Sequence, residues 1–407
     1  MTTPPPPAAE PSQRLLSLDA LRGFDMFWIM GGDALLRAVE KMQDNATTRF
    51  FGAQLRHADF VGLTFYDLIF PLFVFIVGVS VALALPRSVA RIGRAATVRR
   101  VLGRTVILVL LGIFASGGLS HPWPEVRLLG VLQRIGLCYG ATALLALFLR
   151  PRALVAVCVA LLVGYWAALT FIPIRDLQLE KQNLKQQLAA TGAADAQALF
   201  AQTSARVSGK YEPGLNLANH FDFQFLPGAK HFTYWDPEGI LSTAPAVVTC
   251  LLGLFAGRLL AERERTAARK VFLLAIFGVA GIAAGFLWSW QFPLAKKIWT
   301  SSFVLVAGGV SALALAGFYL VVDVWGWRRW CRPFVWMGAN AITIYLASNL
   351  LGGFRGIATR LLGGDVRQFF ETNVGPGCGE LVIACGGLAL AFALVRFLYQ
   401  RQIFLRV

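Results

Sequence analysis

The chain has 407 residues, of which 57% are hydrophobic and only 15% are charged, and its mean hydropathy is +0.61. This balance lies far outside that of water-soluble globular proteins and predicts a protein embedded in a lipid bilayer. The net charge of +16 does not indicate a nucleic-acid partner, because the basic residues lie mainly between apolar segments, as the positive-inside rule expects.

Apolar stretches long enough to cross about 30 Å of hydrocarbon as helices recur along the chain. The sequence therefore predicts an all-α polytopic membrane protein of about ten transmembrane helices. The predicted spans are 15–36, 62–86, 104–120, 128–149, 152–172, 240–260, 271–291, 298–322, 333–351 and 379–398. The short connection at 87–104 carries six arginines, whereas the 68 residues from 173 to 240 carry only six basic residues. We therefore expect both termini to be cytoplasmic.

The predicted organisation is one transmembrane domain, residues 15–407, preceded by a tail at 1–14. The tail, MTTPPPPAAEPSQR, is Pro-rich without the apolar core of a cleavable leader, and we expect it to be disordered. Two large periplasmic loops are predicted at 37–61 and 173–240, the second with a polar helical stretch from Arg175 to Arg206. Ordered loops of this length usually cover a functional site, and a solvated connector is the alternative.

Ionisable side chains inside spans cost roughly 2.5 to 3.5 kcal/mol each on insertion, so each is a functional hypothesis. The first span carries Asp19, Arg22, Asp25 and Asp33, which fall within about 120° of one another on a helix. They predict one wall of a polar cavity. The alternative for the first three is a structural ladder of ion pairs at i, i+3 spacing.

Three further polar residues lie toward the outer side. Asp67 stands near the start of the second span, and Arg134 stands in the GVLQRIG stretch of the fourth. They can form a buried salt bridge, or Arg134 can hold a phosphate or orient a catalytic group. His57, just before the second span, can exchange a proton near the outer membrane face. By residue type alone the other histidines are equal candidates: His121, His220 and His231.

Six phrases occur in order along almost the whole chain: SLDALRGFDMFWI (17–29), HADFVGLTFYDLIFPLFVFIVG (57–78), GVLQRIGLCY (130–139), WDPEGILST (235–243), KKIWTSSFVL (296–305) and YQRQIFLRV (399–407). Together they resemble the heparan-α-glucosaminide N-acetyltransferase family and its bacterial relatives among transmembrane acyltransferases. LDALRG alone is common in membrane acyltransferases, but its combination with GLTFYDLIFP and DPEGIL is specific.

The resemblance implies that cytoplasmic acetyl-CoA donates an acetyl group across the bacterial inner membrane to the amine of a glucosamine-type sugar in the periplasm. It places the catalytic histidine at His57, shortly before the GLT motif. A polar residue at the outer end of the first span of the family matches Asp33, which can orient His57 or receive its proton. The animal enzymes have Asn at this position. Asp67 completes the predicted catalytic set.

The donor and acceptor are expected to bind at different depths. Arg22 and the cytoplasmic basic turns are the predicted partners of the acetyl-CoA phosphates, while Gln133 and Arg134 serve the reacting end. Three acids of the large loop, Asp222, Asp236 and Glu238, are predicted to hold the sugar; the alternative for the last two is helix capping. The cysteine pattern predicts neither a disulfide nor a Cys-based metal site, and no metal is expected.

Several alternatives remain open on sequence alone. The animal enzymes carry a His-Glu pair where this chain has Ser348 and Asn349, so the identity of the acceptor sugar does not carry over. His57 can act as a base or become acetylated itself. An amino-sugar transporter, a sugar O-acetyltransferase and a purely structural membrane protein are the rival functions. The family also suggests a homodimer.

Overall fold

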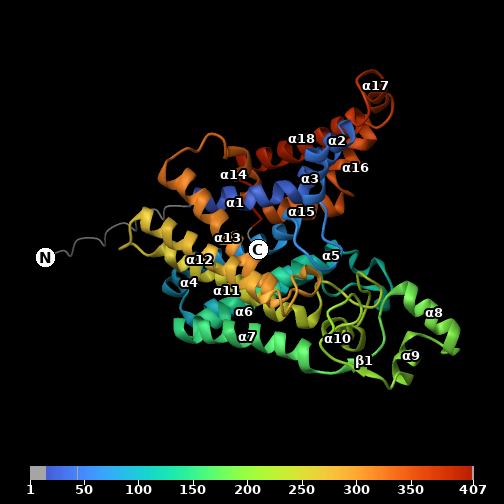
Figure 1. Ribbon diagram of the computed structural model, residues 1–407. Coiled ribbons are helices and arrows are strands. Elements are labelled where there is room, and N and C mark those ends of the chain that lie inside the picture. Colours follow the sequence, from blue (N-terminus) through green and yellow to red (C-terminus); the bar gives the residue numbers. More distant parts are fainter. Residues whose placement is uncertain (1–14, 44, 406–407) are drawn as a thin grey trace.

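The computed structural model describes residues 15–43 and 45–405, so the predicted tail at 1–14 lies outside the described residues. Within that part of the chain, seven helical segments are long and apolar enough to cross a membrane. They are η2 with α4 (Phe65–Leu68, Ile69–Ile92), α6 (Val131–Phe148), α7 (Pro151–Phe171), α11 (Ile240–Ala261), α12 (Ala267–Trp288), α13 with η6 (Ser301–Phe318, Tyr319–Val324) and α18 (Cys378–Gln400). Each coincides with a predicted span. The chain is a predominantly helical polytopic membrane protein of the predicted α class, with one small two-stranded sheet (Figure 1).

The other three predicted spans are interrupted or shifted. Span 15–36 is built from α1 (Leu16–Phe27), η1 (Trp28–Gly32) and α2 (Asp33–Met42), with a break at Gly31, whose φ is 117°. Span 104–120 lies mostly in α5 (Arg94–Ala115), which begins and ends earlier than predicted and carries several arginines. Span 333–351 divides into α14 (Arg332–Ala339) and α15 (Ala341–Leu350). The number of ten spans and the side of the termini therefore stay predictions.

Glycines allow the central helices to approach closely. A Cβ at Gly78 of α4 would lie 1.8 Å from the carbonyl oxygen of Cys250 in α11, and one at Gly253 would lie 1.9 Å from that of Phe75. Small residues at helix contacts are typical of membrane bundles, where packing replaces the hydrophobic effect as the driving force. The α4–α11 pair forms the centre of the bundle, and α6 packs against both helices.

The second predicted loop, 173–240, folds around an apolar core to which α7 and residues 292–298 also contribute. It contains β1 (Ile174–Arg175), α8 (Lys181–Thr191), α9 (Ala196–Gln202), β2 (Arg206–Val207) and α10 (Leu217–Phe225). The predicted helical stretch is thus two short helices, because Gly192 ends α8 in a left-handed conformation and two strands pair at its flanks. Buried Phe223 and Trp235 pack with Phe60 from the first predicted loop, so the two loops share one core.

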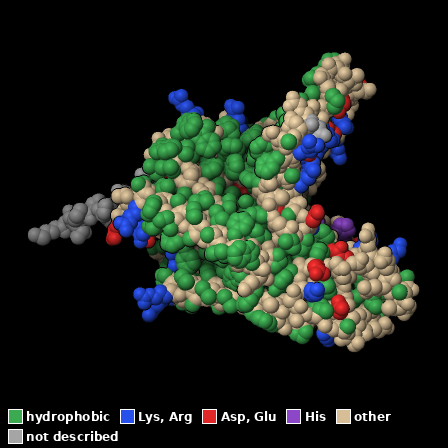
Figure 2. Space-filling view, viewed as in Figure 1, with side chains coloured by type: hydrophobic (Ala, Val, Ile, Leu, Met, Phe, Trp, Pro, Cys, Tyr) green, Lys and Arg blue, Asp and Glu red, His purple; other side chains and the backbone are tan. Residues whose placement is uncertain are grey.

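The remaining elements are short and lie at the ends of the bundle. They are α3 (Ala46–Gln54), η3 (Gly118–Ser120), η4 (Trp123–Glu125), η5 (Lys296–Ile298), α16 (Phe354–Leu362) and α17 (Asp365–Asn373). We call the end that carries α3, α8, α9 and α10 the loop end, and the opposite end, where α4 meets α5, the basic end. Apolar side chains cover the middle of the molecule between these ends, and charged ones gather outside this belt (Figure 2).

Candidate active site

A cavity of about 560 Å³ opens at the basic end between α1, α4, α5, α6 and α14–α15. Five arginines line it: Arg22, Arg87, Arg91, Arg100 and Arg104. No Asp or Glu is among its described lining residues, which leaves a strongly positive chamber. Its inner part is apolar, with Phe73, Leu108 and Ile135. A charged mouth and an apolar interior fit a ligand that has phosphates at one end and a thin, less polar arm at the other.

Arg22 connects this cavity with the first span. Its guanidinium donates hydrogen bonds to Ser80 Oγ at 2.8 Å and to Asp19 Oδ1 at 3.2 Å. The ion pair predicted between Asp19 and Arg22 therefore forms, and Arg22 still lines the cavity. The ladder does not continue, because neither carboxylate oxygen of fully buried Asp25 has a hydrogen-bond partner among the described residues.

His57 and Asp67 meet at the loop end. His57 Nδ1 lies 2.8 Å from Asp67 Oδ1, and the other carboxylate oxygen accepts the backbone N–H groups of Ala58 and Thr64 and the Thr64 hydroxyl, at 2.9 to 3.2 Å. Asp67 is 1% exposed, whereas half of the His57 side chain is open. The carboxylate is therefore fixed on the protein, and the imidazole reaches outward from it.

A lysine that the sequence did not single out completes this group. Lys296 Nζ lies 3.5 Å from Asp67 Oδ1 and 3.1 Å from His57 Nδ1. One Nδ1 cannot both donate to the carboxylate and accept from the ammonium. We assign Nδ1–H as the donor to Asp67, because that bond is the shorter and joins a donor to an anion. The Nε2 lone pair of His57 is then free to accept a proton.

The short segment 296–299 contacts both the His57 group and Arg134. Burial lowers the pKa of Lys296, and the nearby carboxylates of Asp67 and Glu238 oppose that shift. Lys297 donates to the carbonyl of Asp59, which fixes the His57 loop. Trp299 has a positive φ of 52°, is buried, and lies under the Arg134 guanidinium at 5.0 Å. Strained backbone of this kind concentrates at functional sites.

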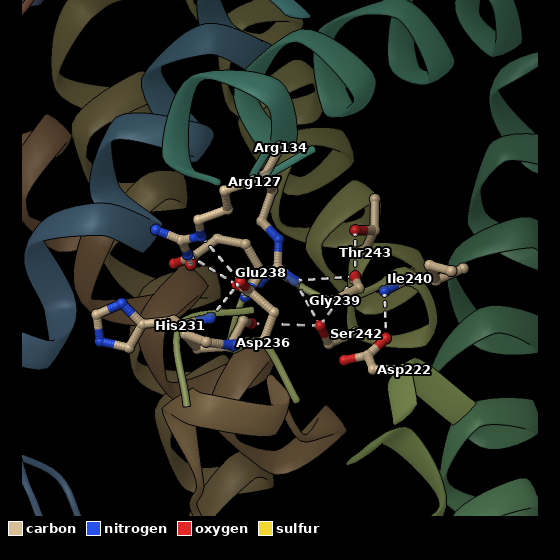
Figure 3. A network of polar contacts seen from close by, with 11 residues as sticks. Arg127, Arg134, Asp222, His231, Asp236, Glu238, Gly239, Ile240, Ser242 and Thr243 are labelled. Atoms are coloured by element: carbon tan, nitrogen blue, oxygen red, sulfur yellow. Dashed lines mark hydrogen bonds and ion pairs between the residues drawn. The ribbon is translucent and has the colours of Figure 1, made fainter. Parts of the chain in front are cut away.

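Two of the three predicted sugar-binding acids, Asp236 and Glu238, form an ion-paired network, shown in Figure 3. Arg127 donates to both oxygens of Asp236 and to Glu238 Oε2, each at 2.8 Å. Burial alone would raise the pKa of Asp236, but Arg127 and the N–H groups of His231 and Glu238 hold it low. Asp236 is 1% exposed, and its carboxylate already accepts from Arg127 and from two backbone N–H groups, so it stabilises the loop around residues 231–238. Glu238 is more open and faces the Lys296 side of the site.

Asp222, the third predicted acid, lies on α10 and is 1% exposed. Its carboxylate accepts the backbone N–H of Ile240 at 2.9 Å, at the first residue of α11. Burial raises its pKa to about 7 against the effect of this bond. Capping of α11 thus falls to Asp222, whereas Asp236 and Glu238 pair with Arg127. Helix capping, which was the predicted alternative for Asp236 and Glu238, is therefore the role of Asp222.

Arg134 and Gln133 lie on α6 toward the loop end, outside the described lining of the basic cavity. Arg134 does not pair with Asp67. Its Nη2 donates to Ser242 Oγ and to the carbonyl of Gly239, and its Nε and Nη1 have no partner among the described residues (Figure 3). The Gln133 Nε2 is likewise buried without a described partner. These are free N–H donors deep in the protein, available to a carbonyl or anionic ligand.

Asp33 forms no described hydrogen bond or ion pair with His57. It forms an ion pair with Arg37 one turn further along α2, and the described contacts of His57 go to Asp67, Lys296 and Tyr66. Among the described residues, no group of three or more His, Cys, Asp or Glu side chains is placed to share a metal ion.

Two functional candidates escaped the sequence analysis, Lys296 and Arg127. Lys296 begins a phrase that carried the resemblance, KKIWTSSFVL, but a lysine beside a span normally indicates topology. Arg127 gave no signal, because its two carboxylate partners are more than a hundred residues away.

Sequence comparison now adds to this geometry. The chain is 27% identical over 341 residues to the human protein "Heparan-alpha-glucosaminide N-acetyltransferase", covering 74% of this chain and 49% of the human one. It is 27% identical over 398 residues to the mouse protein of the same name, covering 85% of this chain and 56% of the mouse one. The chain is related to the heparan-α-glucosaminide N-acetyltransferases.

The relationship predicted from the motifs is thus confirmed. The chain spans about half the length of the heparan-α-glucosaminide N-acetyltransferases that it matches. No protein-family model matches the sequence.

Proposed function

We propose that this protein is a transmembrane N-acetyltransferase that transfers the acetyl group of acetyl-CoA, bound at the basic end, to the amine of a glucosamine-type sugar at the loop end. The proposal places it in a bacterial inner membrane, with the loop end in the periplasm. The observation that carries it is the pairing of a cavity lined by five arginines, with no Asp or Glu among its described lining residues, at one end with an oriented histidine at the other.

In this proposal the basic cavity binds the donor. Arg87, Arg91 and Arg100 surround the mouth and match the phosphates of CoA, and the apolar interior takes the pantetheine arm. Arg134 and Gln133 lie beyond the apolar part, toward the loop end, where their free N–H groups can donate to the thioester carbonyl oxygen. Such donors stabilise the oxyanion of the tetrahedral intermediate in acyl transfer.

His57 acts as the general base for the acceptor. Its Nε2 takes a proton from the sugar ammonium or from the attacking amine, while Asp67 holds Nδ1–H and Lys296 compensates the charge of Asp67. The amine nitrogen forms a bond to the acetyl carbon, and collapse of the intermediate breaks the C–S bond and releases CoA thiolate, which takes up a proton. Glu238 is the partly open acid that can meet the sugar hydroxyls.

The test is acetyl transfer from labelled acetyl-CoA to glucosamine by the purified chain in detergent. We compare the wild type with His57→Ala and with His121→Ala, an exposed histidine with no role in the proposed site. Label on the sugar that is lost only in His57→Ala, with unchanged thermal unfolding, supports the proposal. Full transfer in His57→Ala removes this residue from the mechanism.

The same assay separates the rival functions. N-acetylglucosamine has no free amine, so label transfer to it would indicate an O-acetyltransferase. Wild-type protein that binds glucosamine but shows no acetyl-CoA-dependent transfer would favour an amino-sugar transporter.

A further inference from the structure

A second cavity, of about 180 Å³, lies in the folded loop 173–240, away from His57 and Asp67. Its polar lining consists of Arg175, Arg206, His220 and Gln224, and no Asp or Glu is among its described lining residues. Phe200, Phe221 and Phe225 supply the apolar part. No residue of this cavity takes part in the proposed acetyl transfer.

The two arginines face each other across the small sheet. Arg175 of β1 pairs directly with Arg206 of β2 in antiparallel register, so both side chains project from the same face. Like charges in directly opposite positions destabilise a sheet. Asp176, the next residue along the chain, follows the alternation to the other face and does not line the cavity. The sheet therefore carries a like-charge repulsion that a bound anion would relieve.

The described contacts of the two guanidiniums leave their charge uncompensated. Arg175 donates to the backbone carbonyls of Ala201 and Thr203 and lies 5.0 Å over the ring of Phe200, all neutral groups. The Arg206 side chain is exposed, and no hydrogen bond or ion pair of its guanidinium is described within residues 15–43 and 45–405. Burial of His220, 1% exposed, together with the two arginines, lowers its pKa to about 4. The imidazole is therefore neutral at pH 7.

The cavity lies where the chain leaves the bilayer. Helix α7 is a candidate membrane span that ends at Phe171, and Pro173, Ile174 and Arg175 of the cavity follow within about 13 Å of extended chain. Phe171 and Phe225 flank it with 67% and 60% of their surface exposed. Exposed aromatic rings beside cationic groups are typical of the level of lipid headgroups.

We infer that this cavity binds the phosphate of a phospholipid in the leaflet at the loop end, held between Arg175 and Arg206. The phosphate replaces the missing counter-charge, and the acyl chains lie along the exposed apolar surface of α7 beside Phe171. Bound lipid would anchor the folded loop, including α10, whose Asp222 caps α11 next to the proposed active site. The inference does not depend on the acetyl-transfer proposal.

The experiment measures hydrogen exchange of the β2 and α10 amides in the purified full chain. The three added probes are dioleoyl-phosphatidylglycerol, dioleoylglycerol, which lacks the phosphate, and inorganic phosphate, which lacks the chains. We expect slower exchange only with the phospholipid. Arg206→Gln is the test variant, because Arg206 is exposed and makes no described side-chain contact that folding requires. Lys185→Gln, an exposed basic residue of α8 outside the cavity, is the matched control.

Loss of one charge-assisted contact to the phosphate should raise the lipid concentration for half-maximal protection by about 10-fold in Arg206→Gln. The Lys185→Gln control should stay within about 2-fold of wild type, because surface charge alone contributes little. Equal protection by dioleoylglycerol, or an unchanged midpoint in Arg206→Gln, would overturn the inference. Protection by inorganic phosphate alone would assign the cavity to a soluble anion instead of a lipid.

Discussion

Asp67→Asn is the sharpest test of how the site prepares His57. The amide keeps the size of the carboxylate, and its oxygen can still accept from Ala58 and Thr64, which donate to Oδ2 in the wild-type protein. The amide NH₂ then replaces Oδ1 and donates to His57 Nδ1, so that Nε2 carries the proton and is no longer a base. The ion pair with Lys296, at 3.5 Å, is lost as well.

We therefore expect loss of the general-base contribution, about 10²- to 10⁴-fold in kcat. This corresponds to about 3 to 5 kcal/mol of transition-state stabilisation. The KM for acetyl-CoA should stay near that of wild type, because Asp67 does not line the basic cavity. The assay is steady-state acetyl transfer to glucosamine, with thermal unfolding to establish that the variant is folded.

The matched control is Asp59→Asn, which removes an exposed acid from the same loop and should leave kcat unchanged. A folded Asp67→Asn protein that keeps kcat within 10-fold of wild type would refute the assigned tautomer. Equal losses in both variants would show that the loop, rather than the oriented imidazole, responds to the change.

Three further predictions follow from other parts of the site. Lys296→Met should lower kcat by at least about 10-fold and lower the unfolding temperature, because it leaves the buried charge of Asp67 uncompensated. Lys296→Arg should keep most of the activity, and wild-type kcat in the Met variant would exclude a role for this cation. Arg100→Gln should raise the KM for acetyl-CoA by about 10-fold with little change in kcat. The control is Arg99→Gln at the exposed neighbouring position, which does not line the cavity and should keep the wild-type KM; equal effects in the two variants would show only a general loss of surface charge. Burial raises the pKa of Asp222 to about 7, so the stability that this group contributes, about 4 kcal/mol in all, is complete below about pH 4 and is lost as the pH rises through 7. Asp222→Asn should flatten the fall in unfolding temperature between pH 4 and pH 7, and parallel curves for the two proteins would contradict this prediction.

Hydrophobic patterning was sufficient to predict the class of fold and the approximate positions of seven spans. A span needs only length and apolar composition, and both are local properties of the sequence. The three remaining spans show the limit of this reasoning. Gly31 and Asn340 interrupt two of them, and arginines extend the third toward the basic end, because tertiary contacts and a polar cavity stabilise geometry that a single isolated span does not predict.

The site divides in the same way. His57 and Arg22 could be proposed from their positions relative to motifs and spans. The partner of His57 could not be derived, because the sequence places Asp33, Asp67 and Arg134 all toward the same side of the membrane as His57 and does not show which of them contacts it. Tertiary structure decided that Asp67 holds the imidazole, that Asp33 pairs with Arg37, and that Arg134 donates to Ser242 and Gly239 and to no described carboxylate.

Lys296 and Arg127 illustrate why the rest depended on the fold. Lys296 lies 239 residues from His57 in the chain, and Arg127 lies 109 residues from Asp236. Composition and periodicity report how each segment meets water or lipid, and they carry no information about which distant segment supplies a counter-charge. That choice is made by helix packing, which brings the ends of non-adjacent spans together and sets which charges compensate one another.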